Sequence, residues 1–169
     1  MEKVKPFYVL FGSKNQIEYK GRTINKYVKL TEPGEYVLRF TIIKNNSPFH
    51  QAIVLFFNDF QGEYYLNGAK RPLPKGAFPK ENFWTDTMPQ TTEVALRIRK
   101  GNVVICNGSD PLGTKQICHS LVWGCAIFLE KIGENSFRFN CNDHEIDDDF
   151  DDLIFEMEII KPHSYPRKS

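Results

Sequence analysis

The sequence lacks an apolar run of the ~20 residues that a helix needs to cross a bilayer; its longest apolar stretches are 52–57 and 121–129. Residues 1–6 also lack the apolar segment of a secretory signal. We therefore expect a cytoplasmic protein by default, and secretion as part of a longer or non-classically exported protein stays open. The formal net charge is only +1, so no overall field favours nucleic acid, and we expect no nucleic-acid partner.

Catalytic motifs are also absent. There is no P-loop, nucleophile elbow, HExxH pair or dinucleotide glycine pattern, and the chain has only four histidines. We expect a protein without catalytic activity. A hydrolase that uses two carboxylates of an acidic loop remains an alternative.

The four cysteines show no CxxC spacing. In a reducing compartment they are expected to be small buried residues, and in an exported protein some of them could form a disulfide whose pairing the sequence does not determine. A zinc site is a further alternative, because zinc binds thiolate and imidazole groups. Its ligands would be among Cys118, His119, Cys125, Cys141 and His144.

What the sequence does contain is short runs of Val, Ile, Phe and Tyr, separated by Gly, Asn, Asp and Pro. This pattern predicts an all-β fold, most simply an antiparallel β-sandwich of jelly-roll type, with a closed β-barrel as the alternative. We expect one domain over residues 1–161 and a loose tail over 162–169. The predicted strands are Phe7–Phe11, Lys26–Leu30, Glu35–Ile43, Gln51–Asn58, Glu63–Leu66, Glu93–Arg99, Asn102–Cys106, Val122–Lys131, Ser136–Cys141 and Leu153–Ile160.

Three of these strands alternate clearly between apolar and polar residues. Alternation places successive side chains on opposite faces of a strand, so each should have one core face. Hairpin turns are predicted at Asn67–Gly68, at Lys100–Gly101 and over Gly133–Asn135. The expected core faces are Tyr36, Leu38, Phe40 and Ile42; Val94, Leu96 and Ile98; and Leu153, Phe155, Met157 and Ile159.

Charge placement gives the sharpest functional indication. Nine of the 21 acidic residues lie within the sixteen residues 143–158, directly before and within the last predicted strand. Carboxylates this crowded repel one another unless they are solvated, protonated or neutralised by a cation. Calcium fits best, because it accepts six to eight oxygen ligands in irregular loops. The expected ligands are Asp143, Asp147, Asp149, Asp151 and Asp152. A solvated turn that protects an edge strand is the alternative.

The segment 143–152 resembles the ion loop of the small calcium-dependent bacterial lectins, which are β-sandwich proteins that hold sugar hydroxyls through bound calcium. Asp143, Asp147, Asp149 and Asp152 match that loop by residue type, with Asp143 at a position where the family usually has Glu. Asp151 stands at the position of the family's Asn. The resemblance covers ten of the 169 residues and implies a calcium-dependent glycan ligand.

Carbohydrate sites pair aromatic faces with a few polar groups, because a sugar ring has an apolar face and a rim of hydroxyls. The long connection 67–92 supplies Phe78, Phe83, Trp84 and Asp86, and the acidic loop supplies Phe150. We therefore expect a calcium-binding β-sandwich module for a glycan or similar polyol. The alternative is a structural or protein-interaction subunit, and an oligomer is open in either case. The expected ligand-binding residues are Phe83, Trp84, Asp86, Asn107, Asp110 and Phe150.

Overall fold

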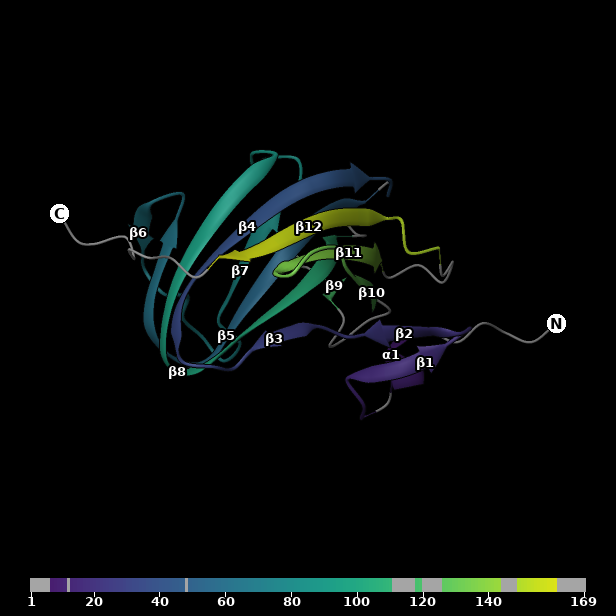
Figure 1. Ribbon diagram of the computed structural model, residues 1–169, viewed down its shortest axis with the longest axis horizontal. Helices are drawn as coiled ribbons and strands as arrows, with labels where there is room; N and C mark the ends of the chain where they lie inside the picture. The colour runs from purple at the N-terminus through teal and green to yellow at the C-terminus, as the bar shows by residue number, and fades with distance from the viewer. Residues whose placement is uncertain are drawn as a thin grey trace.

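The computed structural model describes residues 7–11, 13–47, 49–110, 118–119, 126–143 and 149–160. Within these residues, one short helix is followed by twelve strands. Figure 1 shows how they are arranged. No helix within these residues is long and apolar enough to span a membrane. The elements are α1 (Phe7–Phe11), β1 (Gln16–Tyr19), β2 (Arg22–Asn25), β3 (Val28–Leu30), β4 (Gly34–Asn45), β5 (His50–Leu66), β6 (Ala69–Arg71), β7 (Lys80–Trp84), β8 (Thr91–Asp110), β9 (Cys118–His119), β10 (Ala126–Lys131), β11 (Ser136–Asn142) and β12 (Leu153–Ile160).

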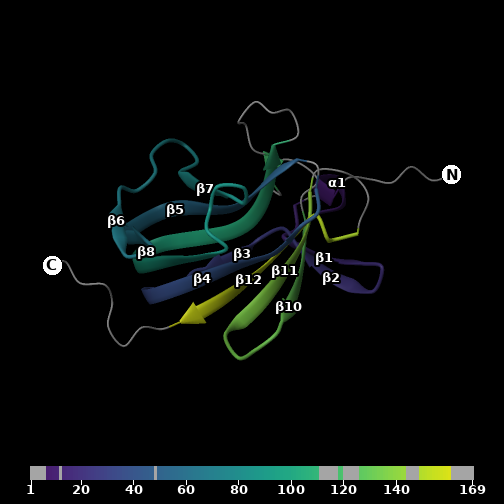
Figure 2. The same cartoon turned by 90° about the horizontal axis from the view of Figure 1, so that it is seen from above.

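All the strand pairings are antiparallel and belong to one sheet. Its order is β1-β2-β10-β11-β12-β4-β8-β5-β6, and β3, β7 and β9 pair beside this path. Figure 2 shows β4, β12, β11 and β10 side by side. The all-β antiparallel prediction is confirmed, and the sheet does not close into a barrel.

The sheet folds back on itself because its two longest strands bend together. The first half of β8 pairs with β4, and its second half pairs with β3 and the first half of β5. The pairing of β5 with β8 shifts register between Asn58 and Gly62, opposite Lys100–Asn102. Figure 1 shows both strands turning sharply at this point. A β-bulge bends a strand, so the extra residues explain the fold-back.

The predicted core faces line the space inside the bend. Leu38, Leu96 and Phe155 are fully buried, and they belong to one cluster with residues of the returning halves of β5 and β8. Ile42 and Ile159 pack at its margin. The stacked rings of Phe139 and Phe155, with centroids 4.5 Å apart, join β11 to β12 within this cluster. Two of the four cysteines, Cys106 and Cys141, are buried and free within the described residues.

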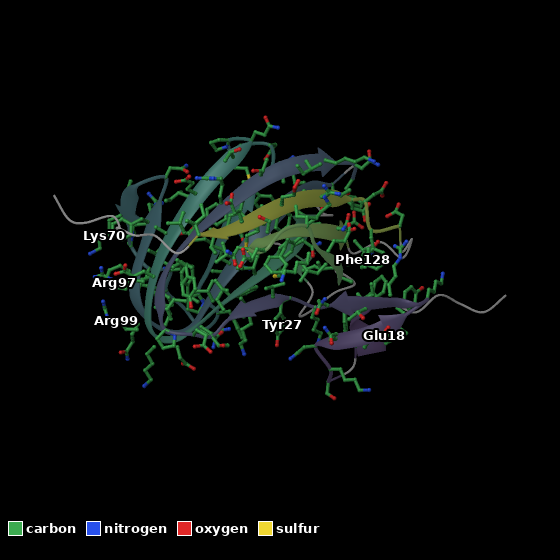
Figure 3. The ribbon with its side chains drawn as sticks, in the orientation of Figure 1. Glu18, Tyr27, Lys70, Arg97, Arg99 and Phe128 are labelled. Atoms are coloured by element: carbon green, nitrogen blue, oxygen red, sulfur yellow. The ribbon has the colours of Figure 1, made fainter. Side chains whose placement is uncertain are left out.

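The outer face carries cross-strand ion pairs. Arg97 Nη2 lies 2.8 Å from Glu35 Oε1, and Arg99 Nη1 lies 2.7 Å from Glu63 Oε1. The hydrogen bond from Arg99 lowers the pKa of Glu63. Figure 3 shows Arg97 and Arg99 on the outside of the bend, on the face of β8 opposite the predicted core residues Val94, Leu96 and Ile98.

Three local predictions were wrong. Residues 7–11 form a helix and not a strand, because Phe7 and Phe11, one helical turn apart, both bury their rings in a small cluster with Ile24 and Phe150. Lys100–Gly101 is not a hairpin turn: β8 continues through it, although Gly101 has the expected positive φ of 82°. Residues 67–92, for which no strand was predicted, contain β6 and β7. The hairpins at Asn67–Gly68 and Gly133–Asn135 are confirmed.

Candidate calcium site and surrounding residues

Several strand ends meet at the end of the sheet opposite the bend. The last residues of β4, β7, β8 and β11 lie here, together with the first residues of β5 and β12. Backbone and side-chain hydrogen bonds join them: Asn46 N donates to Asp152 O at 2.9 Å, and Asn45 Nδ2 donates to Thr85 Oγ1 at 2.9 Å. Thr85 N donates in turn to Gln51 O at 2.9 Å. This network positions the acidic loop against β4.

Three carboxylates of the acidic loop converge. Asp149, Asp151 and Asp152 each offer an oxygen, and these oxygens all lie within 4.8 Å of one another. Asp149 is exposed, Asp151 is half-buried and Asp152 is buried, so the group extends from solvent to the edge of the core. Between them, Phe150 has a φ of 55° and packs its buried ring 5.4 Å from that of Phe7. The loop is therefore anchored on α1 through this aromatic contact.

Some carboxylate oxygens of this group have protein partners. Asp152 Oδ2 accepts from Asp143 N at 2.9 Å. Asp151 Oδ2 accepts from Asn46 Nδ2 at 3.1 Å and lies 3.7 Å from Lys44 Nζ. These contacts hold the carboxylates of Asp151 and Asp152 in place, and the Lys44 ammonium group offsets part of the negative charge of Asp151.

Asp143 lies beside the three-carboxylate group and is not part of it. Its side chain is buried, and its Oδ2 accepts from Ser47 Oγ at 2.7 Å. Its backbone N holds Asp152, so Asp143 connects the end of β11 to the acidic loop. The fifth predicted ligand, Asp147, is outside the described residues, as are Cys125 and His144 of the zinc alternative.

A buried polar cluster lies under this end of the sheet. Gln51 pairs with Ser109, and Ile53 pairs with Asn107, so Gln51, Asn107 and Ser109 share one face of the β5–β8 pair. That face is directed toward β11, because Asn107 Nδ2 donates to Asn142 O at 2.9 Å. Gln51 Oε1, Asn107 Oδ1 and Ser109 Oγ are buried and have no hydrogen-bond partner within the part of the chain that the structure describes.

The nearby Cys141 thiol is uncharged at neutral pH. Burial raises its pKa well above the ordinary value, and the Cys106 thiol and the Asp152 carboxylate raise the pKa further. Cys141 therefore adds no negative charge next to the acidic group.

The predicted ligand-binding residues do gather at this end, but not as one open surface. Trp84 is half-buried, with its ring 6.2 Å from that of His50, and Asp86 is exposed with Oδ2 3.6 Å from His50 Nε2. Phe83 is buried opposite Ile53 in the core.

The other three predicted residues are also buried. Asn107 belongs to the polar cluster, and Asp110 ends β8 opposite His50. Phe150 is used in packing against Phe7. Rings buried in this way have little surface left to stack on a ligand, which leaves Trp84 as the predicted aromatic with exposed area.

Sequence reasoning missed Lys44, Asn46, Ser47, Gln51 and Ser109. They are ordinary polar residues at strand ends, and no spacing pattern links them to the acidic loop. Lys44, Asn46 and Ser47 lie beside the acidic loop and Asp143 because β12 pairs with β4. Gln51 and Ser109 face each other because β5 pairs with β8.

The chain was also compared with known proteins. No family model, no curated protein and no solved structure matches it. The resemblance to the lectin loop therefore depends on the loop residues alone.

The chemistry of the group can still be stated. Carboxylate oxygens that converge in a partly solvated loop are hard ligands, suited to calcium or magnesium and not to soft metals. An irregular loop with a half-exposed rim leaves room for water ligands, which calcium also accepts.

Proposed function

We propose that this protein is a non-catalytic, calcium-binding β-sandwich module that recognises a glycan or similar polyol. The observation that carries the calcium half is the convergence of Asp149, Asp151 and Asp152, whose ligand oxygens lie within 4.8 Å of one another. Their mutual repulsion disfavours the folded loop, and a divalent cation turns that repulsion into attraction.

Calcium would act here as a structural clamp. Asp151 and Asp152 are already bonded to the segment after β4, through Asn46 Nδ2 and Asn46 N. An ion held by the acidic loop therefore stabilises the junction between β4 and β12.

A hydrolytic role is less well supported. Two catalytic carboxyl groups of a glycoside hydrolase face each other across a cleft, about 5 to 9.5 Å apart. The three carboxylates here come from one loop of four residues and converge on one point. This arrangement suits a cation better than an acid and base on opposite sides of a substrate.

A calcium titration of thermal stability tests the proposal. At calcium one hundred times its Kd, binding stabilises the folded state by about 2.7 kcal/mol, which raises Tm by roughly 5 to 10 °C in a chain of this size. Asp149→Asn should abolish this rise. It should also raise Tm slightly without calcium, because it removes like-charge repulsion from an exposed position.

The matched control is Asp86→Asn, which removes an exposed carboxylate at the same end of the sheet but outside the group. This variant should keep the full calcium response. A wild-type Tm that is the same in calcium and in chelator would refute the calcium half, and an equal loss of response in both variants would show that the effect is not specific to the group.

A further inference from the structure

A cavity lies at the bend of β5 and β8, away from the acidic group. Its volume is about 890 Å³, and it lies between residues 57–61 of β5, the loop 73–79 and Lys100. This volume falls within the ~300 to 1,000 Å³ range of ligand sites. None of the six residues expected from the sequence to bind a ligand lines it, but Phe78, another aromatic of the connection 67–92, does.

The walls of the cavity are fixed by backbone geometry. Asn58 pairs with Asn102 and Gln61 pairs with Lys100, so Asp59 and Phe60 form a bulge opposite the single residue Gly101. Asp59 has a φ of 48°, a left-handed conformation that is uncommon for residues other than glycine. The loop on the other side is tied to β5 by a hydrogen bond of 2.9 Å from Phe57 N to Pro79 O. Such strained, well-fixed segments are frequent at binding sites.

The lining combines apolar rings with polar groups of both signs. Phe57 and Phe60 contact each other edge to face, with centroids 5.2 Å apart, and supply an aromatic wall. Across the opening, Phe78 is 78% exposed, the highest exposure of any large apolar side chain in the described residues. The Phe78 ring is therefore available at the rim of the cavity to pack against the apolar face of a ligand.

The polar groups of the lining are available to a ligand. Neither Asp59 nor Lys100 forms an ion pair within the described ranges, and both contribute to the wall together with Gln61. The Asn58 side chain is oriented by donating from Nδ2 to Asn102 Oδ1 at 3.1 Å. The lining therefore offers hydrogen-bond acceptors and donors from the Asp59 carboxylate, the Lys100 ammonium group and the amides of Asn58 and Gln61. Because the two charges are opposite, this set suits a neutral ligand with many hydroxyls.

We propose that this cavity is the carbohydrate-binding site, in which the apolar face of a pyranose ring packs on Phe78 and its hydroxyls bond to Asp59, Gln61 and Lys100. The proposal rests on the glycan half of the proposed function and gives it a location. It also separates the ligand from calcium: Asn58 and His50 are eight residues apart along β5, which corresponds to roughly 26 Å of extended strand. The acidic group therefore does not contact the bound sugar.

The test is a screen of the full chain on an array of defined oligosaccharides, in calcium and in EDTA, followed by calorimetry with the strongest neutral oligosaccharide that binds. Phe78→Ala and Lys100→Ala should each weaken binding about tenfold or more. Binding by the wild type should be the same in calcium and in EDTA at a temperature well below Tm. Phe78→Ala should leave Tm unchanged, because its ring is mostly in solvent.

Two controls separate the possible outcomes. Ile43→Ala removes another exposed apolar side chain, and Asp86→Asn removes a carboxylate at the opposite end; both should bind as the wild type does. Binding that survives Phe78→Ala and Lys100→Ala but is lost in Asp86→Asn or in EDTA would overturn the cavity proposal and leave glycan recognition standing. An array with no bound oligosaccharide in either condition would overturn the cavity proposal and the glycan half together, while the calcium titration would still decide the calcium half.

Discussion

At the scale of single residues, two buried tyrosines differ in what their hydroxyl groups contact. Tyr36 OH donates to Glu32 O at 2.9 Å. Tyr64 OH is buried and has no hydrogen-bond partner among the described residues. Burial raises the pKa of Tyr64 and the neighbouring Glu81 raises it further, so this hydroxyl is neutral at physiological pH. An uncompensated buried hydroxyl reduces stability.

Replacing each tyrosine with phenylalanine should therefore have different effects on the free energy of unfolding. Tyr36→Phe should lower the free energy of unfolding by about 1 kcal/mol, because it leaves the Glu32 carbonyl without this donor. Tyr64→Phe should leave it unchanged or raise it by about 1 kcal/mol, because only a desolvated hydroxyl is lost. Urea denaturation of the two variants and the wild type measures both values. A loss in Tyr64→Phe as large as that in Tyr36→Phe would show that the Tyr64 hydroxyl has a partner in the folded protein.

At the scale of elements, the bend in β5 and β8 depends on close backbone approach. A Cβ built on Gly101 would lie 2.3 Å from Asp59 O and 2.4 Å from Asn58 O. Gly62 is equally restricted, since its Cβ would lie 1.7 Å from Arg97 O. Glycine at these two positions is what allows the bulge to lie flat against β8.

Gly101→Ala should destabilise the protein more than Gly68→Ala does. The two glycines have nearly the same φ, 82° and 85°, so the cost of a left-handed alanine, about 1 to 2 kcal/mol, is common to both. Nothing lies within 4 Å of a Cβ at Gly68, so any further loss at Gly101 measures the clash with the bulge carbonyls. Thermal and urea unfolding compare the variants. Equal losses would mean that the bulge moves freely and that the wall of the cavity is not rigid.

At the scale of the whole molecule, the acidic group lies directly before the start of β12, and the cavity lies at the bend of β5 and β8. Figure 1 shows the start of β12 and this bend at opposite ends of the folded sheet. The acidic group and the cavity share no residue, and the hydrophobic core lies between them. Distant sites without shared partners contribute to stability nearly additively. Calcium should therefore act on the fold without altering the bend.

This independence predicts that calcium raises Tm equally in Phe78→Ala, in Lys100→Ala and in the wild type. In free energy, the stabilisation by calcium should agree among the three proteins within about 0.5 kcal/mol. The measurement is the calcium titration of Tm repeated on the two cavity variants. A calcium response that changes with either substitution would show that the two ends are coupled through the core.

The fold was predictable where residues a few positions apart decide the structure. Alternation in 35–42, 94–99 and 153–160 predicted three strands and their buried faces, and Asn67–Gly68 predicted its hairpin. Prediction failed where packing with distant residues decides. Phe7–Phe11 is apolar enough for a strand or a helix, and its burial against Phe150 and Ile24 selects the helix. Lys100–Gly101 has residue types typical of a turn. Because a bulge in β5 lies opposite it, the chain bends here within one strand and does not form a hairpin.

The sequence by itself determined that the chain is all-β and that carboxylates crowd before its last strand, because alternation and charge density are properties of neighbouring residues. The tertiary structure alone decided which carboxylates converge, which polar residues lie under them, and that a cavity forms at the bend. These features depend on strand register between segments far apart in the chain, and register is set by the packing of the whole sheet.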